Sequence, residues 1–169
     1  MHVCAIIPAY NEEKTVGNVI KVLLRVNEIQ QIIVVSDGSK DHTAQVARQF
    51  GATVIELQEN QGKGGAMKVG IEQCTAEIIL FMDADLIGLT EIHVGNLLHP
   101  VISGEVEMTV GIFEGGRFST DLAQKVSPFL SGQRAIRRSV LEQLSNMEMT
   151  KFGVEIALTR HVRKNGILY

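Results

Sequence analysis

Short apolar runs alternate with amphipathic stretches along the first half of the chain. The runs are rich in β-branched residues, which predicts strands, and the stretches between them repeat apolar residues at helical spacing. The predicted strands are Val3–Ile7, Gln31–Ser36, Ala52–Leu57 and Glu77–Met82. The predicted helices are one capped by Asn11, one that begins at Ser39 or Asp41 and runs to about Phe50, and one over Met67–Cys74. This alternation is typical of an α/β sheet whose parallel strands are joined by crossover helices.

The second half of the chain has a less regular pattern. We expect helices over Thr90–Ile102, within Leu122–Leu130 as far as Pro128, and over Ser139–Leu144 and Val154–Val162. We expect strands over Glu105–Phe113 and Gly132–Arg138. The last residues, Gly166–Tyr169, have the pattern of an extended element that has only begun. We therefore expect one domain over residues 1–169 that is truncated at its C-terminus.

The composition excludes several classes of protein. Apolar residues make up 45% and charged residues 21% of the chain, and the net charge of -3 gives no basic field, so nucleic acid is not an expected partner. The first apolar run ends at Pro8 and is too short for a signal peptide. No run approaches the roughly 18 residues of a membrane span, although peripheral membrane contact stays open. Cys4 and Cys74 are predicted to be buried free thiols, which favours a cytoplasmic protein.

Polar motifs follow the first four predicted strands. They are Pro8-Ala9-Tyr10-Asn11-Glu12, Ser36-Asp37-Gly38-Ser39, Asn60-Gln61-Gly62-Lys63-Gly64-Gly65 and Asp83-Ala84-Asp85. In parallel α/β sheets, ligands bind outside the carboxyl ends of the strands. Each motif is weak evidence by itself, but their shared position after strands indicates one ligand site.

Asp83 and Asp85 follow an apolar strand and lie close in sequence. Two carboxylates at a buried strand end repel each other unless a cation compensates them. Their hard oxygens suit Mg²⁺ or Mn²⁺, which could bridge to a diphosphate. The alternative is that the pair caps a turn and the next helix. The accompanying motifs favour the metal.

The other motifs suit a nucleotide. Asp37 could accept hydrogen bonds from a ribose or a base, although Asp-Gly-Ser also forms turns without a ligand. The glycines around Lys63 would let backbone amides approach a phosphate, although a flexible turn with a solvated lysine explains them as well. The turn at Tyr10 could present an aromatic face to a base, and Glu12 also suits the first turn of a helix.

Basic and acidic residues of the second half could bind an acceptor. Arg117 follows two glycines, and Arg134, Arg137 and Arg138 lie near a predicted strand; all would suit a phosphate, although a solvated face explains Arg137 and Arg138 better. Glu155 begins a predicted helix and could orient an acceptor hydroxyl or act as a base.

The ordered set of motifs resembles the GT-A glycosyltransferases of the family-2 type. The resemblance covers nearly the whole chain and implies a Rossmann-like GT-A fold with a mostly parallel sheet, a nucleotide-sugar donor and a divalent metal, Mg²⁺ or Mn²⁺. By position it implies that Asp85 is the principal metal ligand, with Asp83 the carboxylate nearer the ribose and a second candidate ligand. The donor-binding residues it implies are Pro8, Ala9, Tyr10, Glu12, Asp37, Lys63, Asp83 and Ala84.

The second half is most similar to glucosyl-3-phosphoglycerate synthases. Gly115-Gly116-Arg117 with Thr120-Asp121-Leu122, and the segment Phe152–Ile156, resemble their acceptor segments. This implies that Arg117, Thr120 and Glu155 bind the acceptor. The histidine that completes the metal site in that family would fall beyond Tyr169. Polyprenyl-phosphate sugar transferases share the first four motifs and remain an alternative.

We therefore expect a metal-dependent enzyme that moves a hexose from a UDP- or GDP-sugar to a small or lipid-linked acceptor, phosphorylated or not. Residues up to about 88 would bind the donor and residues from about 105 the acceptor. Asp85 and Glu155 are the catalytic candidates; an inverting enzyme needs a base such as Glu155 or Asp121, and a retaining enzyme needs none. A sugar nucleotidyltransferase, a non-catalytic binding module and a homodimer stay open.

Overall fold

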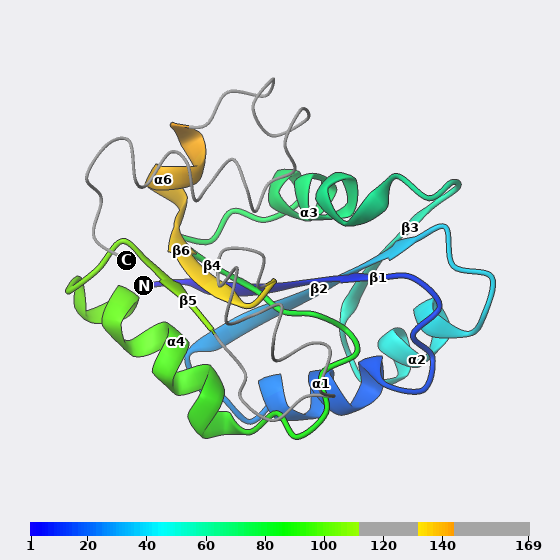
Figure 1. The fold of residues 1–169 in the computed structure, drawn as a ribbon, viewed down its shortest axis with the longest axis horizontal. Coiled ribbons are helices and arrows are strands. Elements are labelled where there is room, and N and C mark those ends of the chain that lie inside the picture. Colours follow the sequence, from blue (N-terminus) through cyan, green and yellow to red (C-terminus); the bar gives the residue numbers. More distant parts are fainter. Residues whose placement is uncertain (112–131, 144–169) are drawn as a thin grey trace, which may run out of the picture.

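The computed structural model describes residues 1–111 and 132–143, which form a mostly parallel sheet with helices on both faces (Figure 1). The strand order is β3-β2-β1-β4-β6-β5. The strands are β1 (Val3–Ala9), β2 (Ile29–Asp37), β3 (Thr53–Leu57), β4 (Ile78–Phe81), β5 (Met108–Val110) and β6 (Arg134–Arg137). The helices are α1 (Val16–Leu23), α2 (Thr43–Gln49), α3 (Gly62–Glu72), α4 (Glu91–Ser103) and α6 (Arg138–Glu142).

The first four strands are parallel and the last two introduce an antiparallel edge. Strand β1 pairs in parallel with β2 on one side and with β4 on the other, and β2 pairs in parallel with β3. Strand β6 lies antiparallel between β4 and β5. The alternation of strands and helices therefore predicted the fold class correctly.

Side chains on β1 alternate between two hydrophobic cores, because successive residues of a strand point to opposite faces of the sheet. Val3, Ala5 and Ile7 pack with α1, α2 and α4 on one face. Cys4 and Ile6 pack with α3 and α6 on the other face. Helices thus cover both faces of the sheet, which explains why its central strands are continuously apolar.

Helix α1 begins later than its sequence pattern predicts. Asn11 does not cap it, because Asn11 has a φ of 55°, in the left-handed region. The helix begins at Val16 after Thr15, and the Glu12 carbonyl accepts hydrogen bonds from the Thr15 and Val16 amides. Glu12 therefore lies in the loop before α1 rather than in its first turn.

Helix α3 begins earlier than predicted. It starts at Gly62 rather than Met67, so the glycine-rich segment forms its first turns. Glycine has a low helix propensity, which is why the sequence indicated a loop there. Lys63 consequently lies in the first turn of α3.

Helix α4 lies within one residue of its predicted bounds, whereas strand β6 is shorter than the predicted Gly132–Arg138. Arg137 and Arg138 do not lie on a solvated face. Arg137 Nη2 donates to the Val101 carbonyl at 2.9 Å, and Arg138 Nε donates to the Ala76 carbonyl at 2.7 Å. The helices expected over residues 122–130 and 154–162 and the extended stretch over 166–169 lie outside the described residues. Cys4 and Cys74 are buried and free, as predicted.

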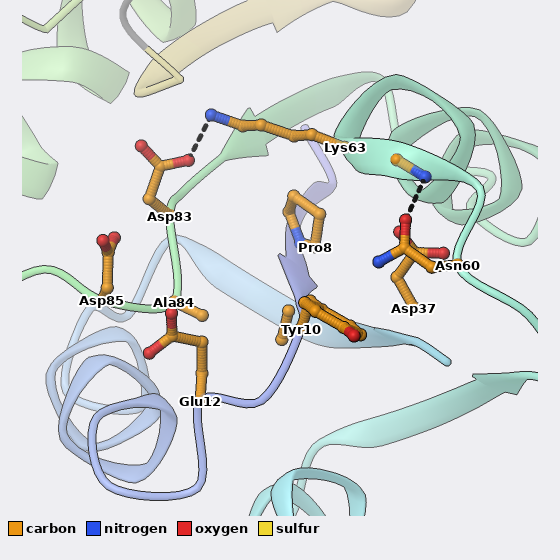
Figure 2. Close-up of a pocket in the computed structure, with 11 residues that line it drawn as sticks. Pro8, Tyr10, Glu12, Asp37, Asn60, Lys63, Asp83, Ala84 and Asp85 are labelled. Atoms are coloured by element: carbon orange, nitrogen blue, oxygen red, sulfur yellow. Dashed lines mark hydrogen bonds and ion pairs between the residues drawn. The ribbon is translucent and has the colours of Figure 1, made fainter. Parts of the chain in front are cut away.

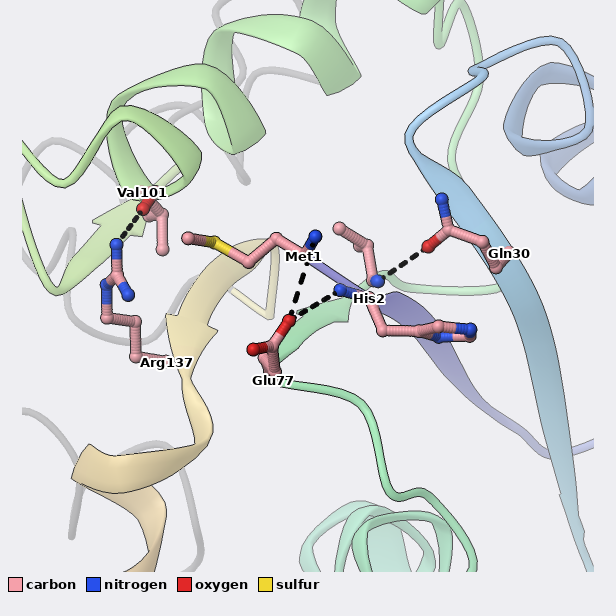
Figure 3. Close-up of polar contacts among 7 residues, drawn as sticks. Met1, His2, Gln30, Glu77, Val101 and Arg137 are labelled. Atoms are coloured by element: carbon pink, nitrogen blue, oxygen red, sulfur yellow. Dashed lines mark hydrogen bonds and ion pairs between the residues drawn. The ribbon is translucent and has the colours of Figure 1, made fainter.

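Within the described ranges, no helix has the length and apolar character needed to cross a membrane. At the amino ends of the parallel strands, polar side chains link neighbouring strands (Figure 3). Glu77 accepts a hydrogen bond from the His2 amide at 2.8 Å and lies 3.8 Å from the Met1 amino group, while Gln30 Oε1 accepts from the Val3 amide at 2.7 Å. These contacts join β1 to its two neighbours at the edge where the parallel strands begin.

The packing of α3 on the sheet predicts unequal effects of two glycine substitutions. A Cβ at Gly70 would lie 2.5 Å from Ile6 Cγ2, so Gly70→Ala should lower the free energy of unfolding by about 1–3 kcal/mol through overpacking. Gly95→Ala on α4 is the matched control, because its Cβ would meet only the His99 ring at 3.4 Å. We expect Gly95→Ala to be neutral or stabilising by up to about 1 kcal/mol. Urea unfolding measures both; equal effects would contradict the close packing at Gly70.

Candidate functional site

The carboxyl ends of β1, β2 and β4 and the start of α3 line one pocket of about 300 Å³ (Figure 2). Its lining residues are Pro8, Ala9, Tyr10, Glu12, Asp37, Asn60, Gly62, Lys63, Asp83, Ala84 and Asp85. The pocket therefore contains residues of all four polar motifs that the sequence placed after strands. Open α/β sheets bind ligands at this edge.

The end of β1 contributes an aromatic side chain and a carboxylate. Tyr10 is 46% exposed, so its ring is available to a ligand. Glu12 is fixed more firmly: its carboxylate accepts from the Thr15 hydroxyl at 2.7 Å, and its backbone amide donates to Thr43 Oγ1 at 2.8 Å. The turn at Asn11 makes this exit from the strand possible.

Asp41 ties the loop after β1 to the start of α2. Its Oδ2 accepts from the Glu13 amide at 3.1 Å, and its Oδ1 accepts from the Thr43 amide at 3.0 Å and from the Thr43 hydroxyl. Partial burial acts to raise the pKa of Asp41, but these hydrogen bonds outweigh it and hold the pKa below its ordinary value. The sequence placed the start of this helix at Ser39 or Asp41. The structure begins α2 at Thr43, and Asp41 lies in the loop before it.

Asp37 ties β2 to the start of α3. It is only 3% exposed, and its Oδ1 accepts from the Gln61 amide at 2.7 Å. Gly38 makes this approach possible: it has a φ of 68°, and a Cβ there would lie 2.7 Å from the Asn60 amide nitrogen. Asp37 thus has a fixed position in the pocket wall, beside Asn60 (Figure 2).

Asp83 is held on both carboxylate oxygens. Lys63 Nζ lies 2.5 Å from Asp83 Oδ1, and Gln133 Nε2 donates to Asp83 Oδ2 at 2.6 Å. Sequence reasoning did not identify Gln133, because it belongs to no motif. It lies near the start of a predicted strand that is itself rich in arginine, so nothing in the sequence set it apart, and the structure buries it to 3% exposure.

Asp85 differs from Asp83. It is exposed to the pocket, and no side chain of the described ranges donates a hydrogen bond or forms an ion pair with its carboxylate. An exposed, uncommitted carboxylate beside a second carboxylate fits a hard divalent cation such as Mg²⁺ or Mn²⁺. In residues 1–111 and 132–143, no three His, Cys, Asp or Glu side chains gather as a complete metal site. Asp85 is therefore the most available carboxylate for a cation in the pocket, with Asp83 two residues before it.

The pocket unites the predicted donor and metal residues. Their individual roles stay predictions, since their chemistry follows from position and not from a bound molecule. Asn60 and Gly62 belong to the same pocket. The predicted acceptor residues Arg117, Thr120 and Glu155, and Asp121, lie outside the described residues.

A sheet of this order, with an acidic pocket that suits a nucleotide at the carboxyl ends of its parallel strands, is typical of the GT-A class of nucleotide-sugar transferase folds. Solved structures support this assignment. Glucosyl-3-phosphoglycerate synthase from Mycobacterium tuberculosis, crystallised with Mn²⁺, UDP-glucose and phosphoglyceric acid, is similar with a TM-score of 0.80 and 27% identity over 97% of this chain. The same enzyme crystallised with Mg²⁺ and UDP gives the same TM-score and identity. The fold is therefore GT-A, as the sequence resemblance implied.

The sequence pattern of glycosyl transferase family 2 matches residues 4–158, so the chain belongs to that family. Among curated proteins, 4,4'-diaponeurosporenoate glycosyltransferase of Staphylococcus aureus (strain USA300) is 36% identical over 99 residues, which are 56% of this chain. The chain spans 26% of that relative and 65% of the solved synthase. It thus corresponds to one part of each.

The lowered pKa of Asp41 predicts a pH-dependent contribution to stability. A carboxyl whose folded pKa lies below its unfolded value stabilises the fold above the ordinary value, and that stabilisation is lost as the pH falls through the lowered pKa. Asp41→Asn should therefore lower the free energy of unfolding by about 1–2 kcal/mol near pH 7. Below the ordinary value of 3.8 the difference from wild type should shrink.

Urea unfolding across this pH range measures the difference. Glu59→Gln is the control, because Glu59 is exposed and should show no such convergence. A difference between Asp41→Asn and wild type that stayed constant with pH would contradict the role of the charged carboxylate.

Proposed function

We propose that this chain transfers a hexose from a UDP- or GDP-sugar to an acceptor and binds the donor in the pocket at the carboxyl ends of β1, β2 and β4. The observation that carries the proposal is the convergence of Asp37, Lys63, Asp83 and Asp85 on one pocket from separate segments. Membership of glycosyl transferase family 2 supports the same reaction class. The solved synthase, crystallised with UDP-glucose, makes UDP the first nucleotide to test.

The nucleoside would lie over the carboxyl ends of β1 and β2. Asp37 is buried and keeps one oxygen on the Gln61 amide, so its second oxygen can accept from a base or ribose hydroxyl. The exposed ring of Tyr10 would cover the base on the other side.

The diphosphate would lie between the first turn of α3 and the two aspartates. The Lys63 side chain and the positive end of the α3 dipole would supply positive charge for the phosphates. Asp85, with Asp83 beside it, would hold Mg²⁺ or Mn²⁺. The chemistry that a divalent cation supplies there is neutralisation of the charge that develops on the departing diphosphate. In an inverting enzyme, Glu155 would act as the base on the acceptor hydroxyl. A retaining enzyme would need no such base.

Two classes of acceptor suit this chain. The solved synthase binds phosphoglyceric acid, which favours a small phosphorylated acceptor contacted by Arg117, Thr120 and Glu155. The diaponeurosporenoate transferase favours a lipid acceptor instead, with peripheral membrane contact. We place the reaction in the cytoplasm, because both cysteines are free.

Thermal unfolding with nucleotides tests the donor site. UDP or GDP at about 100 times its Kd should raise the unfolding free energy by about 2.7 kcal/mol, which is several degrees in Tm. Asp85→Asn should remove the part of this shift that depends on Mn²⁺, because it removes the charge of the exposed carboxylate that has no protein partner in the described ranges. Glu77→Gln, at the opposite edge of the sheet, is the control and should keep that part. No shift with either nucleotide and metal would contradict the proposal.

Release of UDP or GDP from a panel of their sugars tests the reaction and the acceptor. Stimulation by 3-phosphoglycerate would support the small phosphorylated acceptor, and stimulation by a polyprenyl phosphate or a carotenoid acid would support the lipid. Release from none of the sugars, with or without these acceptors, would contradict transferase activity of the chain.

A further inference from the structure

Two residues that lie far apart in the sequence bind the Asp83 carboxylate. Lys63 reaches Oδ1 from the first turn of α3, and Gln133 reaches Oδ2 from the residue before β6. Gln133 is 3% exposed and the Asp83 side chain is 25% exposed, so its hydrogen bond to the charged carboxylate is partly buried. A hydrogen bond of this kind is stronger than a neutral one, and leaving the carboxylate without it costs more.

The backbone around Gln133 is fixed by the antiparallel edge of the sheet. Arg134 pairs with Phe81 of β4, so the residues before Arg134 lie opposite those after Phe81. The Gly111 amide donates to the Gln133 carbonyl at 2.8 Å, which holds the segment from the other side. The side-chain amide of Gln133 therefore reaches Asp83 from a rigid backbone.

Gly132 completes the arrangement by having no side chain. A Cβ at Gly132 would collide with Lys63 Nζ and with Asp83 Oδ1, and would lie 2.7 Å from Asp83 Oδ2. The Lys63–Asp83 ion pair thus occupies the space that a side chain at position 132 would need. A larger residue there would force the carboxylate or the ammonium group to move.

We propose that Gln133 is a positioning residue for the donor site: with Lys63 it fixes the orientation of the Asp83 carboxylate, and Gly132 leaves the room that this orientation needs. The proposal rests on the proposed donor site for the purpose of Asp83. Because Gln133 and Lys63 engage both oxygens of Asp83, Asp85 presents the uncommitted carboxylate to a cation. The antiparallel second half of the sheet thereby sets the geometry of a pocket that the parallel first half forms.

A double-mutant cycle between Gln133 and Asp83 tests this role in the complete chain. The variants are Gln133→Met, which keeps the length of the side chain and removes its donor, Asp83→Ala, and the two combined. If Gln133 acts through Asp83, Gln133→Met should weaken UDP binding in the presence of Mn²⁺ by about tenfold in the wild-type background. In the Asp83→Ala background the same change should alter binding by less than about twofold.

Gln30→Met is the matched control. It makes the same chemical change and removes the hydrogen bond to the Val3 amide at the other edge of the sheet (Figure 3). It should leave UDP affinity unchanged in both backgrounds. A loss of affinity on Gln133→Met that was equal in both backgrounds would show a general effect on folding and overturn the proposal, as would no loss at all.

Gly132→Ala is a second variant that removes no hydrogen-bonding group. It should weaken UDP binding about as much as Gln133→Met, and unchanged affinity would overturn the proposed need for space. The same cycle measured by urea unfolding without nucleotide separates this inference from the proposed function. If wild type binds neither UDP nor GDP, the proposed function fails. Non-additive effects of the two substitutions on the free energy of unfolding would then still support the Gln133–Asp83 interaction, and additive effects would contradict that interaction as well.

Discussion

The parallel pairing of β1 with both β2 and β4 is the interaction on which the rest of the structure depends. The register places Ala9 beside Ser36 and Ile6 beside Phe81, and the Met82 amide donates to the Ile6 carbonyl beyond the end of β4. Neighbouring strands lie about 4.8 Å apart, so the polar ends of the three strands meet within about 10 Å. The pocket is a consequence of this pairing.

Such a pocket is useful only if its polar groups are held in place, and the structure holds them through the loops. Asp37 joins the end of β2 to α3, and Asp41 joins the loop after β1 to α2. Gly38 permits the closest of these approaches. Groups ordered before the ligand arrives lower the entropy cost of binding, so these contacts contribute to affinity without touching a ligand. Tyr10 and Asp85 are the more exposed groups and remain available for contact.

Much of this arrangement could be predicted from the sequence, for a definite reason. The central strands β1 and β4 are apolar and buried, and each polar motif follows one strand of the first half. The parallel sheet therefore brings the motifs to the same end of the strands. The start of α3 could not be predicted in this way, because the four residues from Gly62 to Gly65 include three glycines and local propensity opposes a helix there. The contact of Gln133 with Asp83 depends on the antiparallel register of β6 against β4, which no motif encodes. Arg137 and Arg138 likewise find backbone carbonyls that only the tertiary fold presents to them.

The central claim is that the carboxyl edge of β1, β2 and β4 binds a metal–nucleotide complex. A crystal of the chain grown with Mn²⁺ and UDP, measured near the manganese absorption edge, tests it most directly. The account predicts one anomalous peak beside the Asp85 carboxylate, with the diphosphate between that peak and Lys63 and the uridine against Asp37 and Tyr10. Manganese and nucleotide bound elsewhere on the molecule, with this pocket holding only water, would contradict it.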